Sequence, residues 1–365
     1  MTRVTIAVQP RPYDAIIENG VLERAGEHLQ RIVVNRPPLF VVTVPPVRRK
    51  WNKKLMMSLL AAGFTPKLVE MPDGERSKKL ATVEALAEKL TRLGADRNAM
   101  IVAFGGGVVG DVAGLLASLY MRGVNLVQIP TTVQAQLDAA IGGKTGVNLR
   151  TAKNLLGTFH QPRLVLIDPA VLSTLPEREF RAGLYEALKC GVIGNPALFG
   201  CLEKIQVRAL RRDVPALEWV IAESVRLKAE VVASDERESG LRRVLNFGHT
   251  IGHALEAESG YRRFLHGEAV AWGMIAATHI AAMTGRIDND TARRISNAVL
   301  GLGKLPLIEA RSRDIVRLLQ SDKKTRDGVV HFVLPREIGK VEIATDVPES
   351  VVMTALNELR RLSRA

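Results

Sequence analysis

The stretch Leu245–Met274 reads LNFGHTIGHALEAESGYRRFLHGEAVAWGM and carries three of the seven histidines of the chain. Asn246 is a residue type that caps helices, so a helix is expected to run from there to Ser259. Gly260 supplies the residue that most often ends a helix. The stretch therefore predicts a helical segment that carries histidines.

The spacing of these histidines suits a divalent metal. His249 and His253 are four residues apart, so they share a face of the expected helix. His266 opens a second, nearly all-apolar helix, which is expected to end near Gly285. A divalent metal can be bound by imidazoles that converge at two helix starts. One carboxylate would complete a set of three protein ligands and leave the fourth position of the metal open. A surface or core role for the pair is the alternative, because the H-E-x-x-H pattern of zinc proteases is absent.

Composition favours a globular chain of two domains. The 365 residues are 47% hydrophobic and 24% charged, enough for two separate cores. No apolar run reaches membrane-spanning length. The N-terminus reads as an alternating strand and not as a signal peptide, so a cytoplasmic protein is expected. Cys190 and Cys201 are too few for a disulfide framework or a thiolate zinc site.

The charge balance points to an anionic ligand. The formal net charge is +13, and the lysines and arginines are spread along the chain. Aromatic residues make up only 4%, too few for a base-stacking surface. We therefore expect a phosphorylated small molecule and no nucleic-acid partner.

Strands and helices alternate through the first half, which predicts an α/β fold with a parallel, doubly wound sheet. The expected strands are Val4–Val8, Leu39–Val44, Lys67–Met71, Met100–Phe104, Val124–Ile129 and Leu164–Ile167. The expected helices are Val47–Gly63 and Ser77–Leu93.

The second half is predicted to be mostly helical, with a domain boundary between residues 177 and 178. Besides the two histidine helices, the expected helices are Arg178–Ile193, Pro196–Leu210, Pro215–Ser234, Asp290–Leu302, Ser312–Leu319 and Ser350–Leu362. The two expected strands are Val329–Leu334 and Lys340–Ala344.

A glycine-rich turn follows the strand Met100–Phe104 and reads GGGVVGD, Gly105–Asp111. It fits G-x-G-x-x-G between a strand and a helix, where the backbone can approach a pyrophosphate. A tight strand–helix turn without a ligand is the alternative. The ribose-binding acid that usually follows is missing, but the upstream turn offers Glu75 for a ribose hydroxyl and Lys78 for a phosphate.

A long loop between residues 129 and 154 also suits an anion. It contains Pro-Thr-Thr at 130–132, Gly-Gly-Lys-Thr-Gly-Val-Asn at 142–148, and a second lysine, Lys153. The glycine spacing excludes a Walker loop. Lysine donors beside glycine-rich backbone favour an anionic ligand over a merely solvated loop.

Together these pieces resemble the 3-dehydroquinate synthase family of the sugar-phosphate cyclase superfamily. The matching segments stand in the family's order over nearly the whole chain. They are the glycine turn with Asp111, Pro-Thr-Thr of 130–132, the 142–148 segment, Lys153-Asn154, Glu186-Ala187-Leu188-Lys189, Asn-Phe-Gly-His-Thr-Ile-Gly-His of 246–253, and His-Gly-Glu-Ala-Val of 266–270.

The resemblance implies an N-terminal Rossmann-like NAD domain (1–177) and a helical metal- and substrate-binding domain (178–365). It implies a zinc or cobalt ion held by Glu186, His249 and His266. His253 is then not a metal ligand and is assigned to the substrate instead. The residues implied for NAD are Asp73, Gly74, Glu75, Arg76, Ser77, Lys78, Gly105, Gly106, Gly107, Val108, Val109, Gly110, Asp111, Thr131, Thr132, Asp138, Lys144, Lys153, Val171, Leu172, Ser173 and Thr174.

The implied reaction converts 3-deoxy-D-arabino-heptulosonate 7-phosphate to 3-dehydroquinate and phosphate, with NAD regenerated in each turnover. The resemblance also implies a homodimer. The residues implied for the substrate are Asp138, Lys144, Asn154, Lys189, Lys228, Arg242, Asn246, His253 and, from the Asp322-Lys323-Lys324 turn, Lys323. The residues implied for catalysis are His253, Lys144, Glu238 and Lys189.

One segment departs from the family pattern, and other functions stay open. The second expected strand ends in Thr43-Val44-Pro45-Pro46, where the family carries an Asn or Asp for the adenosine ribose. The alternatives are a cyclase of the 2-deoxy-scyllo-inosose or epi-valiolone type, a metal-dependent polyol dehydrogenase, and a basic nucleic-acid-binding module. Arg242 beside Asn246 favours a substrate carboxylate over the first alternative. Of the other histidines, we expect His279 in a core and His28, His160 and His331 at ordinary surface or loop positions.

Overall fold

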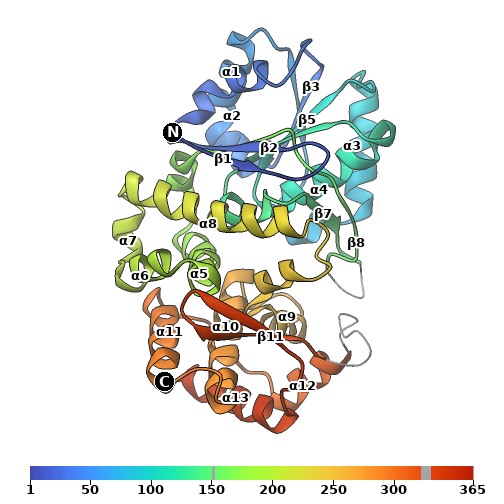
Figure 1. Ribbon diagram of the computed structural model, residues 1–365. Coiled ribbons are helices and arrows are strands. Elements are labelled where there is room, and N and C mark those ends of the chain that lie inside the picture. Colours follow the sequence, from blue (N-terminus) through green and yellow to red (C-terminus); the bar gives the residue numbers. More distant parts are fainter. Residues whose placement is uncertain (150–152, 322–329, 365) are drawn as a thin grey trace. The chain divides into compact units, whose positions relative to one another are not determined.

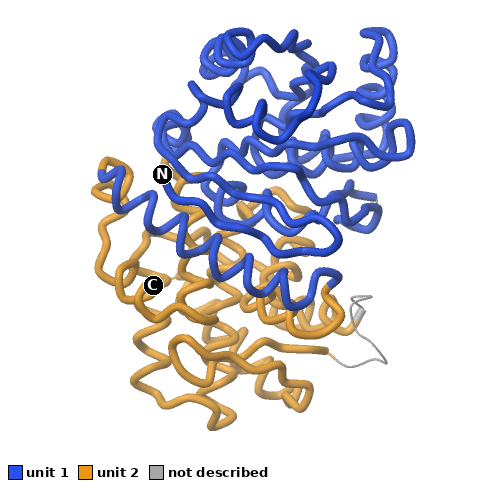
Figure 2. The backbone as a smooth tube through the Cα atoms, turned by 45° about the horizontal axis from the view of Figure 1, so that its top comes forward, with its two compact units in different colours: residues 1–176, 213–237 blue, residues 177–212, 238–365 orange. Residues whose placement is uncertain are grey.

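The computed structural model describes residues 1–149, 153–321 and 330–364 of the chain (Figure 1). Two compact units make up the chain (Figure 2): Met1–Pro176 with Asp213–Arg237, and Glu177–Arg212 with Glu238–Ala365. This division differs from the expected single boundary, because the segment 213–237 groups with the first unit. Within the described ranges, no helix is long and apolar enough to cross a membrane.

A mostly parallel sheet forms the centre of the first unit and confirms the predicted fold class. Among the described residues its order is β1 (Thr2–Ile6), β2 (Tyr13–Ile17), β9 (Leu164–Ile167), β6 (Asn125–Pro130), β5 (Met100–Gly105), β3 (Leu39–Thr43) and β4 (Pro66–Glu70). Strands β1 and β2 are antiparallel, and the other neighbours are parallel. The sequence analysis did not predict β2.

The helices of the first unit follow the strands. They are α1 (Ala25–Gln30), α2 (Pro45–Ala61), α3 (Leu80–Arg92), α4 (Gly107–Leu119) and α8 (Val214–Ser234), with short 3₁₀ or π turns η1 (Val21–Arg24), η2 (Glu75–Ser77), η3 (Tyr120–Arg122), η4 (Ala135–Ala139) and η5 (Pro169–Thr174). The helix predicted from Ser77 therefore begins later, because η2 precedes it. His28 was expected at the surface, but this residue of α1 is buried.

A β-hairpin begins inside the segment that we predicted as a loop and ends beyond it. Strands β7 (Lys144–Val147) and β8 (Leu156–Phe159) pair antiparallel. The hydroxyls of Thr145 and Thr158 are 2.8 Å apart across the pair. The prediction of an irregular loop is therefore wrong for β7, although the glycine turn before it remains; β8 was not predicted.

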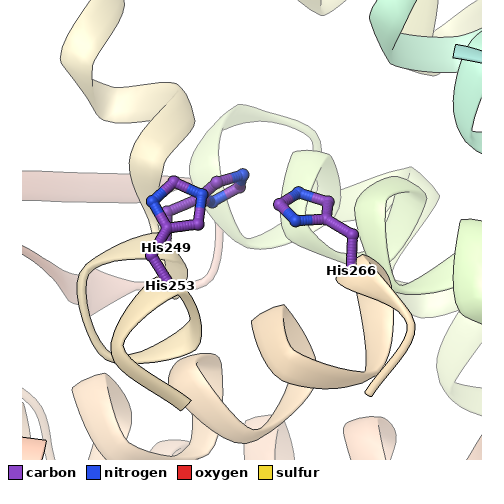
Figure 3. Close-up of side chains that lie close together, drawn as sticks. All are labelled: His249, His253 and His266. Carbon is purple, nitrogen blue, oxygen red and sulfur yellow. The ribbon is translucent and has the colours of Figure 1, made fainter. Parts of the chain in front are cut away.

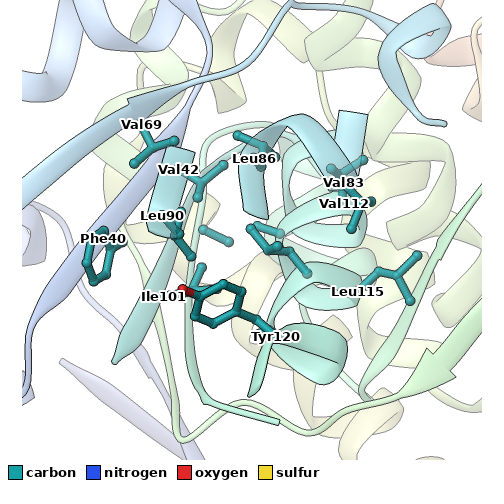
Figure 4. Packing of buried hydrophobic residues seen from close by; sticks show 14 of the residues in the cluster. Phe40, Val42, Val69, Val83, Leu86, Leu90, Ile101, Val112, Leu115 and Tyr120 are labelled. Carbon is teal, nitrogen blue, oxygen red and sulfur yellow. The ribbon is translucent and has the colours of Figure 1, made fainter. Parts of the chain in front are cut away.

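The core of the first unit is apolar because the inner strands are buried on both faces, as in other doubly wound sheets. Helix α3 turns Val83, Leu86 and Leu90 toward the same apolar cluster that Val112 and Leu115 of α4 enter (Figure 4). This packing fixes the start of α4 directly after the end of β5.

The second unit is mostly helical, as predicted. Its elements are α5 (Glu177–Gly194), α6 (Pro196–Lys204), α7 (Val207–Leu210), η6 (Leu241–Asn246), α9 (His249–Glu258), α10 (His266–Met283), α11 (Asn289–Gly301), α12 (Ser312–Ser321), α13 (Glu349–Leu362) and the antiparallel strands β10 (Phe332–Glu337) and β11 (Lys340–Ala344). The helix predicted over 196–210 is two helices. Asn246 does not cap α9: the cap is Gly248 with φ 79°, and Asn246 ends η6 instead.

Glycines let three helices of this unit approach closely. A side chain at Gly267 of α10 would overlap the carbonyl oxygen of Ala182 in α5. A side chain at Gly273 of α10 would overlap the carbonyl oxygen of Gly248 at the start of α9. Because α10 has no Cβ at these two positions, it can pack tightly against both α5 and α9.

Candidate active site

Three imidazoles converge where α9 and the start of α10 meet. The rings of His249 and His253, one turn apart on α9, face the ring of His266 at the first residue of α10 (Figure 3). The ring centroids are 5.2 Å apart for His249 and His253, 5.2 Å for His249 and His266, and 5.7 Å for His253 and His266. One nitrogen from each ring lies within 4.8 Å of the others, a spacing that a metal ion could bridge.

A buried carboxylate from α5 completes this cluster. Glu186 Oε1 is 3.2 Å from Nε2 of His266 and 3.7 Å from Nε2 of His249. Donors about 2.1 Å from a tetrahedral ion lie about 3.4 Å from one another, so these separations fit a common cation. Glu186 is 0% exposed, and its two oxygens face different groups: Lys189 Nζ lies 2.7 Å from Oε2, whereas the imidazoles lie beside Oε1. A buried carboxylate needs positive charge beside it; Lys189 supplies such charge at Oε2, and a metal ion would supply it at Oε1.

The electrostatics of the cluster follow from burial and mutual charge. Burial by itself raises the pKa of Glu186, but the charges of Lys189, His249 and His266 outweigh it and hold that pKa well below its usual range. Burial, together with the Lys189 charge, lowers the pKa of His249 to about 3. Burial opposes protonation of His266 too, yet the carboxylates of Glu186 and Glu256 raise its pKa to about 10. His249 is thus a neutral donor, the form in which an imidazole binds metal.

The sequence analysis missed Glu256. Its Oε2 lies 3.0 Å from Nδ1 of His266, and the residue is 2% exposed. The available signal was its position three residues after His253, which places both on one face of α9.

The other residues expected from this unit cluster near α5 and η6. Lys189 Nζ is 2.7 Å from Glu186 Oε2, one helical turn away on α5. Asn246 Nδ2 donates to Glu238 Oε1 at 2.8 Å. Arg242, also in η6, is 1% exposed, which is rare for a guanidinium. The expected Lys323 lies outside the described residues.

In the first unit the glycine turn presents a helix N-terminus. Helix α4 begins at Gly107, its N-cap Gly106 makes no side-chain cap, and its first turn holds no acidic residue. The first backbone N–H groups of such a helix attract anions. A Cβ at Gly105 would lie 2.5 Å from Val109 Cγ2, whereas a Cβ at Gly107 would meet only Ala139 Cβ at 3.5 Å. Packing therefore explains the glycine at 105 but not the one at 107, where a Cβ would make only an ordinary contact. A glycine without a packing reason suits a ligand that approaches the backbone.

The expected polar residues around this turn form two networks. In the first, Lys78 Nζ is 2.5 Å from Asp111 Oδ2 and donates to Asn154 Oδ1 at 2.5 Å. Burial raises the pKa of Asp111, and the Lys78 charge opposes that rise. The network thus joins the upstream turn, the glycine turn and the lysine-bearing loop in one place.

The second network lies at the exposed end of the same turn. Glu75 Oε1 accepts a hydrogen bond from Asn148 Nδ2 at 2.7 Å and lies 3.7 Å from Lys153 Nζ. A carboxylate already engaged in this way is held in one orientation. Glu75 is therefore fixed in place before any ligand arrives.

Further expected residues are engaged elsewhere in this unit. Lys228 of α8 donates to Asp138 Oδ1 at 2.7 Å and to the Asp138 carbonyl at 2.5 Å. Thr131 N donates to Gly105 O at 2.9 Å, which ties the Pro-Thr-Thr segment to the glycine turn. The segment 171–174 lies in η5, and Trp51 Nε1 donates to Thr174 Oγ1 at 3.0 Å.

Comparison with known families assigns both parts of the chain consistently. A family model described as the N-terminal part of 3-dehydroquinate synthase matches residues 68–182, and one described as the C-terminal part matches residues 183–325. A 3-dehydroquinate synthase of Koribacter versatilis is 55% identical, covering 100% of this chain and 99% of the relative. One from Solibacter usitatus is 47% identical, covering 98% and 99%.

Solved structures of related cyclases share the fold. A 2-epi-5-epi-valiolone synthase from Streptomyces hygroscopicus with NAD⁺ and Zn²⁺ bound is 32% identical, with a TM-score of 0.88 over 98% of this chain and 99% of that one. A 2-deoxy-scyllo-inosose synthase complexed with carbaglucose-6-phosphate, NAD⁺ and Co²⁺ is 26% identical, with a TM-score of 0.86 over 98% and 100%.

Proposed function

The chain belongs to the 3-dehydroquinate synthase family, and we infer that it catalyses the reaction of that family. The substrate is 3-deoxy-D-arabino-heptulosonate 7-phosphate, and the products are 3-dehydroquinate and phosphate. This reaction is the second step of the shikimate pathway, which leads to chorismate and the aromatic amino acids. The enzyme is a carbon–oxygen lyase that uses NAD catalytically and needs a divalent metal.

The observation that carries this proposal is the meeting of Glu186, His249 and His266 at ligand spacing. We assign these three residues as the metal ligands. The buried Glu186 carboxylate fits a cation, and His249 Nδ1 faces the Phe247 carbonyl at 3.2 Å, which leaves Nε2 for the metal. With these three ligands, His253 is assigned to the substrate, a role that a three-histidine site would not allow.

The glycine turn is the proposed site of the NAD pyrophosphate. The absence of a packing reason for glycine at 107 and the uncapped start of α4 support this assignment. Lys78 contributes positive charge, and Glu75 is placed for a ribose hydroxyl. The residues after β3 are Val44, Pro45 and Pro46, whose side chains have no polar group for a ribose hydroxyl. We therefore expect the adenosine ribose to be held by Glu75 and not by the end of β3.

When bound, zinc or cobalt lowers the pKa of a substrate hydroxyl, and NAD accepts and later returns the hydride. We propose that Arg242 grips the substrate carboxylate through two parallel hydrogen bonds. Lys189 and Lys144 offset the negative charge that develops as phosphate leaves. Pre-placed charges of this kind typically lower an activation barrier by several kcal/mol. We assign His253 to proton transfer with the substrate.

The remaining proposed contacts hold these groups in place. Glu238 accepts from Asn246 and so orients that amide toward the substrate. Asp138 holds Lys228 in one direction, and Asn154 does the same for Lys78. Lys323 is retained as a proposed contact to the substrate.

One assay tests the proposal. Phosphate release from the heptulosonate phosphate is measured with and without NAD and a metal chelator. We expect release that requires both NAD and metal, with no net absorbance change from NADH. Accumulation of NADH would indicate a polyol dehydrogenase. Turnover of a sugar phosphate without a carboxylate instead would indicate one of the related cyclases.

Two further expectations belong to the same proposal. We propose a cytoplasmic location, which fractionation would test. We propose a homodimer, which light scattering of the purified chain would test; a monomer at working concentration would contradict it.

A further inference from the structure

Glu256 lies behind the proposed metal ligand His266. It sits on α9, and its Oε2 is 3.0 Å from Nδ1 of His266. The residue is only 2% exposed, so its charge is largely withdrawn from water. A buried carboxylate in contact with an imidazole is well placed to control which ring nitrogen carries a proton.

The geometry separates the two nitrogens of the ring. Nδ1 of His266 faces Glu256, and Nε2 faces Glu186 Oε1 at 3.2 Å. Carboxylate oxygens accept hydrogen bonds, so without a metal both ring nitrogens face an acceptor. A cation bound beside Glu186 would take the place of the Nε2 proton, and the Nδ1 proton would remain on the side of Glu256.

The backbone at His266 is fixed independently of the ring. Leu265 N donates to Glu268 Oε2 at 2.8 Å, which closes a capping turn around the first residue of α10. This contact sets where the helix begins but not how the imidazole is rotated. The ring itself is contacted at its two nitrogens, by Glu256 at Nδ1 and by Glu186 at Nε2.

We propose that Glu256 is a positioning residue for the metal site: it holds His266 as the Nδ1–H tautomer with Nε2 directed at the cation beside Glu186. The inference rests on the proposed ligand set of Glu186, His249 and His266. Partners of this kind behind metal-binding histidines typically change metal affinity by about 10- to 100-fold when they are removed.

The test measures metal binding by the full chain without substrate or NAD. The metal-free protein is titrated with Co²⁺, followed by its visible absorption, and Zn²⁺ affinity is obtained by competition. We expect Glu256→Ala to weaken Zn²⁺ binding by about 10- to 100-fold. Glu256→Gln keeps an acceptor oxygen and nearly the same shape, so a smaller loss is expected.

A matched control removes a carboxylate from the same helix. Glu258→Gln changes an exposed residue two positions along α9, and we expect unchanged metal affinity. Nitrogen NMR of histidine-labelled protein gives a second readout that a merely structural role would not move. In the zinc-loaded parent, His266 should be protonated at Nδ1 and bound through Nε2, whereas Glu256→Ala should lose that single tautomer.

The outcomes separate this inference from the proposed function. Parental zinc affinity in both Glu256 variants, or metal bound through Nδ1 of His266, would overturn the positioning role while phosphate release by the parent still stands. Failure of the parent to bind metal through His266 would remove the ligand assignment itself. If Glu256→Ala does not fold, the near-isosteric Glu256→Gln decides by its metal affinity.

Discussion

Arg178 and Glu268 form a bidentate ion pair, with 2.7 Å between Nε and Oε1 and 2.7 Å between Nη2 and Oε2. Arg178 lies in the first turn of α5, whose later turns carry Glu186, and Glu268 lies in the first turn of α10 beside His266. The Glu268 carboxylate is 1% exposed and also accepts the Leu265 N–H. The pair therefore ties together the starts of the two helices that carry Glu186 and His266, two of the proposed metal ligands.

Replacing Arg178 should destabilise the second unit. Arg178→Ala leaves a buried carboxylate without its partner, and we expect a loss of about 1–3 kcal/mol in the free energy of unfolding. Arg178→Lys should lose less, because it keeps the charge but not the two parallel hydrogen bonds. Urea unfolding followed by circular dichroism measures the difference.

The control for this prediction is Arg208→Ala. Arg208 pairs with Glu177 of α5 at 3.5 Å, but their side chains are 82% and 49% exposed. Exposed pairs contribute little, so no measurable change is expected. Equal losses in Arg178→Ala and Arg208→Ala would show that the bidentate pair has no special role.

Single substitutions of the histidines should identify the metal ligands. His249→Ala and His266→Ala each leave two protein ligands, so we expect loss of bound zinc and of turnover. His253→Asn should retain zinc and lose turnover, because this ring is assigned to proton movement and not to the metal. Metal content after gel filtration and phosphate release are measured on the same preparations. If His253→Asn loses zinc but Glu186→Gln keeps it, the ligands are the three histidines His249, His253 and His266.

The two glycines at the start of α4 should respond differently to an added methyl group. Gly107→Ala places its Cβ 3.5 Å from Ala139 Cβ, an ordinary contact, so the fold should be kept. We expect a melting temperature equal to or above that of the parent. We also expect an NAD affinity reduced by about tenfold, because the added methyl group would keep the pyrophosphate away from the backbone; a tenfold change corresponds to about 1.4 kcal/mol. Calorimetric NAD titration tests this.

Two comparisons frame that experiment. Gly105→Ala puts a Cβ 2.5 Å from Val109 Cγ2, so it should lower the melting temperature itself. Gly200→Ala adds a methyl group in α6 where nothing lies within 4 Å, so it should leave NAD affinity unchanged. Unaltered NAD binding by Gly107→Ala would place the pyrophosphate somewhere else.

Periodicity predicted much of this architecture because it reports burial directly. The run Met100–Phe104 is buried throughout, and the amphipathic pattern ending near Leu93 marks α3. The hairpin of β7 and β8 escaped prediction because glycines and threonines dominate it and its buried side does not alternate. Such a pair is held by cross-strand contacts, which leave little local signal.

The candidate site was predictable only in part for a related reason. Residue spacing indicated His249, His253 and His266, and only the family resemblance named Glu186 and moved His253 away from the metal. The structure brings all four side chains together. Glu256 and the Arg178–Glu268 pair have no local motif, since each acts across a contact between separate helices. The predicted cap at Asn246 was wrong because Gly248 takes up the left-handed conformation that starts α9.

Buried His28 should make the folded chain less stable in mild acid. Burial, with smaller effects from Arg31 and Arg24, lowers the pKa of this imidazole. In the unfolded chain its pKa returns to about 6.5, so below that pH the unfolded state binds the proton more readily. The stability that neutral His28 contributes is therefore present above that pH and is lost as pH falls. We expect His28→Leu to reduce the fall in urea midpoint between neutral and mildly acidic pH, followed by tryptophan fluorescence; a parallel fall in variant and parent would show that His28 is not the acid-sensitive group.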